Sequence, residues 1–151
     1  MRPSIDWFRS LCVIVAIGAA GCDGRNRPSV VPVQGRLLIG GKPAAGANVV
    51  LHPVDPHVVS RSVGLTDADG SFRLMTYKTG DGAPVGNYVV TLFWCDAANP
   101  LDGCTDENLV KHDRLRGAYF DSRKSPLRTI IHAGPNDILI EADAVASSDE
   151  Q

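Results

Sequence analysis

The sequence predicts an all-β fold, a seven-stranded antiparallel sandwich of two sheets that follows an N-terminal signal peptide. Fifteen glycines and ten prolines indicate many turns, while Val, Ile and Leu are plentiful and aromatic residues are few. About seven short apolar runs alternate with turn signals at regular spacing, as in a β-sandwich. The clearest alternation, in residues 87–94, places on one face Tyr88, Val90, Leu92 and Trp94.

The expected strands are separated by turns rich in proline, glycine and aspartate. Pro32 stands near the start of the first strand, where a missing N–H donor does little harm. Gly70 closes the turn between the third and fourth strands, because its backbone can take the positive φ that this turn needs. In chain order, the expected strands cover residues 31–39, 47–52, 60–66, 71–75, 87–94, 127–132 and 138–142.

The N-terminus has the pattern of an export signal. Arg2 and Arg9 outweigh Asp6, and the run at residues 11–20 contains no charge. A spanning helix needs roughly 20 apolar residues, so this run is too short for an ordinary one, whereas it has the length of a signal core. We therefore expect residues 1–21 to be a signal peptide and the rest of the chain to be exported.

Cys22 follows the small residues Ala19, Ala20 and Gly21. This arrangement resembles the lipobox of bacterial lipoproteins, in which the cysteine is acylated and becomes the new N-terminus, although Ala19 stands where the usual box has Leu. An acyl chain contributes about 0.8 kcal/mol per buried methylene, so several chains on Cys22 would hold the protein at a membrane. Two other interpretations stay open, namely cleavage by the ordinary signal peptidase and an uncleaved short anchor.

Beyond the leader, the chain divides into three parts. Residues 22–30 are polar and interrupted by proline, which is typical of a tether. Residues 31–142 contain all the expected strands and have the length of one ordinary domain. The tail at 143–151 is expected to be disordered. The formal net charge of −2 argues against a nucleic-acid partner, which would require a basic face.

Two of the four cysteines, Cys12 and Cys22, belong to the leader or to its end, which leaves Cys95 and Cys104 in the domain. In an oxidising compartment such a pair indicates a disulfide, and so short a ring would contribute roughly 2–3 kcal/mol. Free thiols are a second interpretation. A metal site is a third, with His112 as the nearest additional ligand.

Three segments carry a resemblance to a known family: VQGRLLIGGKPAAGANVVLHP (33–53), GLTDADGSFRL (64–74) and GAPVGNYVVTLFW (82–94). They resemble carboxypeptidase regulatory-like domains, which have a transthyretin-like (prealbumin-like) sandwich with an immunoglobulin-like architecture. The likeness extends to small exported lipoproteins of planctomycete-type bacteria, many of which carry a later segment of the pattern K/A-Y-x-x-x-x-x-S-P/x-L, present here as AYFDSRKSPL (118–127). The resemblance implies this sandwich from Val31 to Ile140 and a folding, adhesion or ligand-presenting role.

No group of residues in the sequence predicts catalysis or a cofactor. The turn at Asp67 and Asp69 superficially resembles a calcium loop, but Phe72 occupies the position where the loop needs glycine. The four histidines show no paired metal-ligand spacing, and no Gly-x-Ser-x-Gly nucleophile motif is present. We therefore predict no enzyme activity, no cofactor and no bound metal. A small hydrolase or metalloprotein is the third hypothesis, which a pocket gathering histidines with carboxylates would favour.

The segment from Cys95 to Gly117 is the best candidate for partner contact. It is charged and turn-rich, and connections longer than about 12–15 residues tend to be functional or disordered. Trp94 beside it would be a rigid platform if exposed, and a core residue if buried. The candidate binding residues are Trp94, Asp102, Lys111, His112 and Arg114. The competing interpretation is a solvated insertion without function.

These observations together predict a lipid-anchored, non-enzymatic module of the cell envelope, in the periplasm or at the cell surface, with a structural or ligand-presenting role. Its partners would be the membrane, through lipidated Cys22, and an envelope protein or glycan. The alternative is a carbohydrate- or peptide-binding module that uses the loop at 95–117. An exposed Trp94 ring would favour this alternative.

Overall fold

The computed structural model describes residues 27–95 and 112–145 of the chain. Ten strands lie in these ranges, and no α-helix does. In chain order they are β1 Val30–Val31, β2 Val33–Ile39, β3 Lys42–Pro43, β4 Ala47–Pro53, β5 Ser62–Leu65, β6 Ser71–Arg73, β7 Ala83–Pro84, β8 Gly86–Trp94, β9 Arg128–Ile131 and β10 Asn136–Ala142. The all-β prediction is confirmed. The count differs from seven because β1, β3 and β7 have two residues each, too few to leave an alternating pattern.

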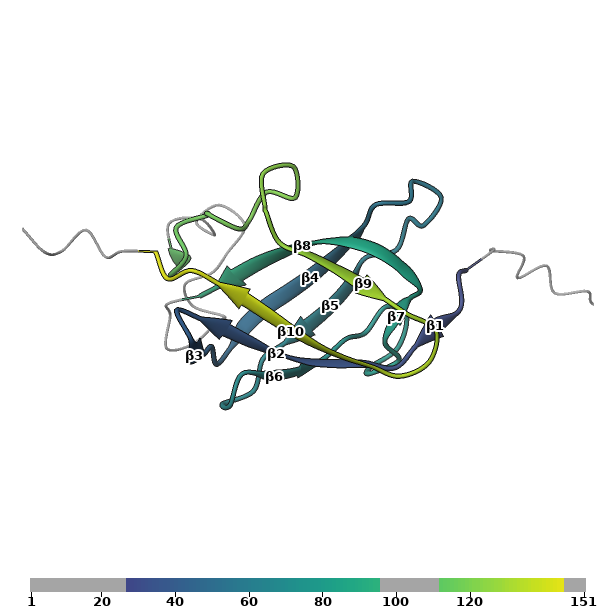
Figure 1. Cartoon of the computed structure of the whole chain (residues 1–151), viewed down its shortest axis with the longest axis horizontal. Helices are drawn as coiled ribbons and strands as arrows, with labels where there is room; N and C mark the ends of the chain where they lie inside the picture. The colour runs from purple at the N-terminus through teal and green to yellow at the C-terminus, as the bar shows by residue number, and fades with distance from the viewer. Residues whose placement is uncertain (1–26, 96–111, 146–151) are drawn as a thin grey trace, which may run out of the picture.

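Two four-stranded sheets face each other across the core (Figure 1). In the first sheet, β2 lies between β10 on one side and β3 and β6 on the other. The second sheet has the order β5-β4-β8-β9, and β1 pairs with β7 in a small third sheet. Alternate residues of β2 and β4 are buried, so each sheet turns one apolar face to the other.

One strand pair is parallel, so the prediction of a purely antiparallel sandwich is wrong. β10 pairs with β2 in parallel, from Asn136 opposite Val33 to Ala142 opposite Ile39, whereas the other pairs of named strands are antiparallel. The turn at 132–135 is short enough for a hairpin. It instead carries the chain from β9, in the second sheet, to β10, in the first, where β10 runs in the direction of β2.

The core is built from the inward faces of both sheets. Leu37 of β2 and Val49 of β4 are fully buried, and so are Tyr88, Val90 and Leu92, three of the four residues whose shared face on β8 was predicted; the fourth, Trp94, is half-buried. Tyr88 begins that face, and its hydroxyl donates a hydrogen bond of 2.7 Å to the carbonyl of Pro84. Burial raises the pKa of Tyr88 to about 12. This bond to a residue four positions upstream holds the entry into β8, as a tyrosine corner does in other sandwiches.

Two glycines stand where the backbone approaches too closely for a side chain. A Cβ on Gly35 would lie 2.4 Å from the carbonyl oxygen of Ile138 and 2.7 Å from the ring of Phe72. Gly82 has φ +96°, and a Cβ there would lie 1.8 Å from the carbonyl oxygen of Val31. Gly35 thus permits the close approach of β10 and β6 to β2, and Gly82 permits the contact of β7 with β1.

The sandwich has two distinct ends (Figure 1). The tether end carries β1, β7 and the turn at 132–135, and the chain enters the fold there. The far end carries the last residue of β8, Trp94, together with β3. β8 has nine residues, so the two ends are about 30 Å apart at about 3.3 Å per residue.

Candidate functional site

The structure describes only part of the predicted site. Outside the described residues lie Cys22, Asp102, Cys104 and Lys111. The lipidation of Cys22 and the disulfide between Cys95 and Cys104 therefore stay predictions. The described members lie together at the far end, because Cys95 forms a β-bridge with Asp113 and so brings the residues around position 113 beside the end of β8.

Trp94 and Arg114 stack on each other at the far end. The guanidinium carbon of Arg114 lies 3.7 Å from the centre of the Trp94 ring, and the backbone N–H of Arg114 donates to the carbonyl of Trp94 at 2.8 Å. The indole N–H donates to the carbonyl of Ala45 at 2.8 Å. Trp94 is half-buried and packs against the core. The ring is thus neither a fully exposed platform nor a core tryptophan, and the exposed Arg114 covers it.

Asp113 holds this arrangement together, and sequence reasoning missed it. Its side chain is buried, at 4% exposure. Its carboxylate accepts the backbone N–H groups of Trp94 at 3.0 Å, Leu115 at 3.1 Å and Gly117 at 2.8 Å. Three donors satisfy the buried carboxylate, which would otherwise be costly to bury. The available signal was an aspartate four residues before a glycine in a turn-rich segment, but the same segment contains many charged residues.

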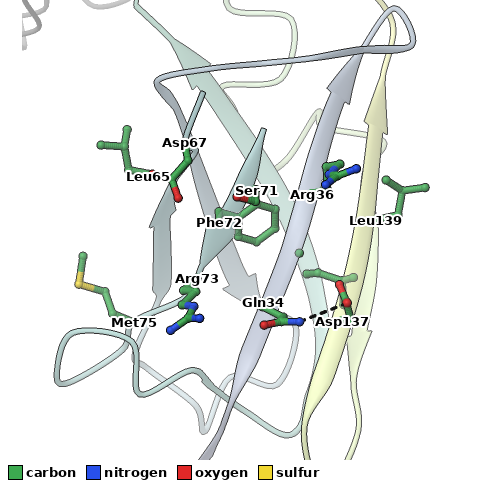
Figure 2. A pocket seen from close by; sticks show the side chains of 12 residues that line it. Gln34, Arg36, Leu65, Asp67, Ser71, Phe72, Arg73, Met75, Asp137 and Leu139 are labelled. Carbon is green, nitrogen blue, oxygen red and sulfur yellow. Dashed lines mark hydrogen bonds between the residues drawn. The ribbon is translucent and has the colours of Figure 1, made fainter. Parts of the chain in front are cut away.

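A wide hollow lies elsewhere, on the outer face of the first sheet (Figure 2). It is open to solvent and has a volume of about 910 Å³. β10, β2 and β6 form its floor, and residues of β5 and of the segment after β6 complete it. We call this hollow the outer groove, and the side chains that the argument uses are Gln34, Arg36, Leu65, Arg73, Asp137 and Leu139.

Strand alternation and register bring these side chains to one face. In β2, Gln34 and Arg36 are exposed while their neighbours are buried. The register places Gln34 between Asp137 of β10 and Arg73 of β6, and Arg36 beside Leu139. The amide of Gln34 donates to the carboxylate of Asp137 at 3.3 Å. The outer groove therefore carries both charge signs and an apolar residue in adjacent rows.

Charges in and beside the outer groove are partly paired. Arg36 lies 3.6 Å from Asp69, and both side chains are well exposed, so the ion pair contributes little to stability. Hydrogen bonds from the hydroxyl and the backbone N–H of Ser71 lower the pKa of Asp69. Arg73 makes no hydrogen bond or ion pair to any other residue in 27–95 or 112–145. No described residue therefore engages the guanidinium of Arg73, which is available to a ligand in the outer groove.

The histidines do not gather in the part of the chain that the structure describes. His52 lies on β4, where Nε2 is 2.8 Å from the hydroxyl oxygen of Thr91, and burial, followed by the charge of Arg61, lowers the pKa of His52. Nowhere in 27–95 and 112–145 are three His, Cys, Asp or Glu side chains arranged to hold a metal ion. A pocket of histidines and carboxylates, which the hydrolase or metalloprotein hypothesis needs, is not found among these residues.

The fold and the far-end cluster define a β protein of two main sheets and one small sheet, with an aromatic–cation pair at one end. Comparison with protein-family models, with curated proteins and with solved structures found no match to the chain. The likeness to carboxypeptidase regulatory-like domains therefore rests on the quoted motifs alone. Over residues 27–95 and 112–145, the structure contains no helix with the length and apolar character needed to cross a membrane.

Proposed function

We propose that the chain is an exported, lipid-anchored, non-enzymatic β-sandwich module of the cell envelope, which presents its far end to partners. The layout of the chain carries the proposal. A signal-like leader ends just before Cys22, a polar tether follows, and the sandwich begins with β1 at the tether end. The stacked Trp94 and Arg114 lie at the opposite end. A domain tethered in this way would turn its recognition residues outward.

The length of the tether supports this arrangement. Eight residue steps separate Cys22 from Val30. A fully extended chain covers at most about 3.6 Å per residue, so the tether would hold the domain within about 29 Å of the lipid. The far end would then lie about 30 Å further out. A protein or glycan of the envelope would meet Trp94 and Arg114 before it met the tether end.

Intact mass of the protein extracted from membranes tests the anchor. Acylation predicts the loss of residues 1–21 and the addition of a diacylglycerol, or more, on Cys22, together with incorporation of labelled palmitate. The disulfide predicts a mass lower by two hydrogens. In the control Cys22→Ser, lipid and label should both be absent. A leaderless chain without lipid would overturn the anchor and keep export, whereas an intact leader without lipid would overturn lipidation in favour of the uncleaved short anchor.

The second candidate function is a carbohydrate- or peptide-binding module built on the far end. The stacking of Arg114 on Trp94 favours it, because an exposed cation over a half-buried ring is a surface that a ligand could share. The chain has two tryptophans, Trp7 and Trp94, and the first belongs to the predicted leader. Emission from the processed protein would therefore report on Trp94 alone.

Titration with envelope glycans and with peptides from envelope proteins tests this second candidate. A ligand at the far end should change Trp94 emission, and Arg114→Ala should abolish the change while Arg114→Lys keeps part of it. Arg73→Ala, in the outer groove, is the matched control and should have no effect. Binding that leaves Trp94 emission unchanged, or that survives Arg114→Ala, would place recognition elsewhere.

A further inference from the structure

Within residues 27–95 and 112–145, β2 is the only strand that pairs with β10, which makes β10 the outer strand of the first sheet. Two hydrogen bonds show which residues of β10 direct their peptide N–H and C=O groups toward β2. The N–H of Asn136 donates to the carbonyl of Pro32, and the N–H of Gly40 donates to the carbonyl of Ala142, each at 2.9 Å. In a parallel ladder, alternate residues bond to the same neighbour. The even-numbered residues of β10 therefore face β2.

The peptide groups of Asp137, Leu139 and Glu141 consequently point away from β2, to the open side of the strand. None of these three residues makes a backbone hydrogen bond to a described residue on that side. Beyond them, the N–H of Asp143 donates to the hydroxyl of Tyr119 at 3.0 Å, which ends the open stretch. Three successive outward residues thus offer N–H and C=O groups that no described residue pairs with, along about 13 Å of strand.

The side chains of the same three residues give this edge a defined chemistry. Asp137 and Glu141 are exposed and acidic, and Leu139 between them is 60% exposed. Residues 133–145 contain no lysine or arginine, and Asp143 adds a further carboxylate. Asp137 and Leu139 also line the outer groove, so the open edge borders a hollow (Figure 2). An acidic, apolar, acidic row therefore accompanies the free peptide groups.

The side chains of Asp137, Leu139 and Glu141 determine which strands could pair with this edge. A second copy added antiparallel about Leu139 would place Asp137 opposite Glu141, and like charges directly opposite each other are destabilising. Charges on an edge strand commonly prevent such self-association. A strand with basic residues at both positions and an apolar residue between them would instead form two opposite-charge pairs and one apolar contact.

We propose that the free edge of β10 binds an extended segment of a partner protein with the pattern basic-x-apolar-x-basic, which joins the first sheet as an additional strand. Main-chain hydrogen bonds to Asp137, Leu139 and Glu141 supply the affinity, and their side chains supply the selection, as in other cases of strand addition. The site lies on the side of the sandwich and does not involve Trp94 or Cys22. It is therefore independent of the far-end site and of the lipid anchor.

The probe is the fluorescein-labelled peptide TKVVVKT, measured by anisotropy against the purified full-length protein in mild detergent. It should bind, and the matched peptide TEVVVET should bind at least about tenfold more weakly, because charge complementarity decides the partner. Raising the salt from about 0.05 M to about 0.5 M should weaken the binding of TKVVVKT, since exposed charges are screened. Failure of TKVVVKT to bind, or equal binding of the two peptides, would overturn the proposal.

Two variants locate the binding. The double variant Asp137→Lys with Glu141→Lys should reverse the preference in favour of TEVVVET. Leu139→Pro removes an outward N–H and puts a ring in the path of the added strand, while the ladder to β2 does not use that N–H. It should abolish binding, whereas the control Leu139→Val should retain it. An unchanged preference in the double variant would overturn the proposal even if Leu139→Pro does not fold, and so would full binding by a folded Leu139→Pro.

Discussion

At the tether end of the sandwich, one carboxylate organises a turn. Asp81 accepts the backbone N–H groups of Thr76 at 2.7 Å, Tyr77 at 3.0 Å and Lys78 at 2.9 Å. All three donors lie within five residues of Asp81 in the sequence. Burial of the half-buried side chain raises its pKa, but the three hydrogen bonds outweigh burial and leave the pKa of Asp81 below its usual value.

At the far end, Asp113 also accepts three backbone N–H groups, but its donors are more widely separated in the sequence. One donor, Trp94, lies 19 residues away in the sequence, and the carboxylate is buried. Asp81 therefore closes a local turn, whereas Asp113 joins two separate segments and holds the stacked pair at the far end. Similar hydrogen bonding thus serves local folding at one end of the sandwich and the geometry of a candidate site at the other.

The largest effect should come from the tether end, at Gly82. Gly82→Ala would bring a Cβ within 1.8 Å of the carbonyl oxygen of Val31 at φ +96°, so β1 and β7 would have to separate. We expect the free energy of unfolding to fall by about 3 kcal/mol or more, measured by urea denaturation. Gly80→Ala is the control, since φ is +70° there but no atom lies within 4 Å, and it should cost about 1–2 kcal/mol. Equal losses would show that contact with β1 is unimportant.

The next effect is at Asp113. Asp113→Ala would leave three backbone N–H groups without their acceptor in a buried position, and we expect a loss of about 3 kcal/mol in the free energy of unfolding. Trp94 should become more exposed, so its emission should shift to longer wavelength. Asp113→Asn keeps one acceptor oxygen and should lose less. A variant Asp113→Ala with unchanged stability and emission would refute the anchoring role of this residue.

The same contrast, between local contacts and contacts distant in the sequence, separates the features that the sequence predicts from those that it does not. The alternation of β8 is local, so its limits were predicted to within one residue, 87–94 against 86–94. The strand with which β10 pairs depends on the direction in which the turn at 132–135 carries the chain. No local sequence pattern specifies that direction. Likewise, Trp94 and Arg114 could be singled out as site residues, but the bond from Trp94 to Asp113 could not.

The outer groove was missed for the same physical reason. Alternation alone predicts that Gln34 and Arg36 lie on one face of their strand. The groove exists because β6 and β10, far away in the sequence, align Arg73 and Asp137 with them. Register between distant strands is set by tertiary packing and turn geometry, not by the composition of any one segment.

A smaller effect is expected at Asp81. Asp81→Ala removes three hydrogen bonds, but the donors lie in a half-exposed turn where water can replace the carboxylate, so the loss should be about 1 kcal/mol at pH 7. The pKa of Asp81 is lower in the folded state than in the unfolded chain. The stability that Asp81 contributes is therefore fully present above the pKa of Asp81 in the unfolded chain. Urea denaturation of both proteins should show the difference shrinking as the pH falls below about 4. A pH-independent difference would contradict this origin.

The smallest effect concerns His52, near the end of β4 on the side of the tether end. Its pKa is lowered in the folded state by burial and by the charge of Arg61, so the unfolded chain takes up the proton more readily. Stability from this residue is complete above the unfolded pKa of about 6.5 and is lost as the pH falls below it. The urea midpoint of the native protein should therefore fall between pH 7.5 and about 5.5, where carboxylates still contribute little. His52→Gln keeps a hydrogen-bonding group near Thr91 and should flatten this dependence. An equally steep dependence in His52→Gln would assign the titration to another group.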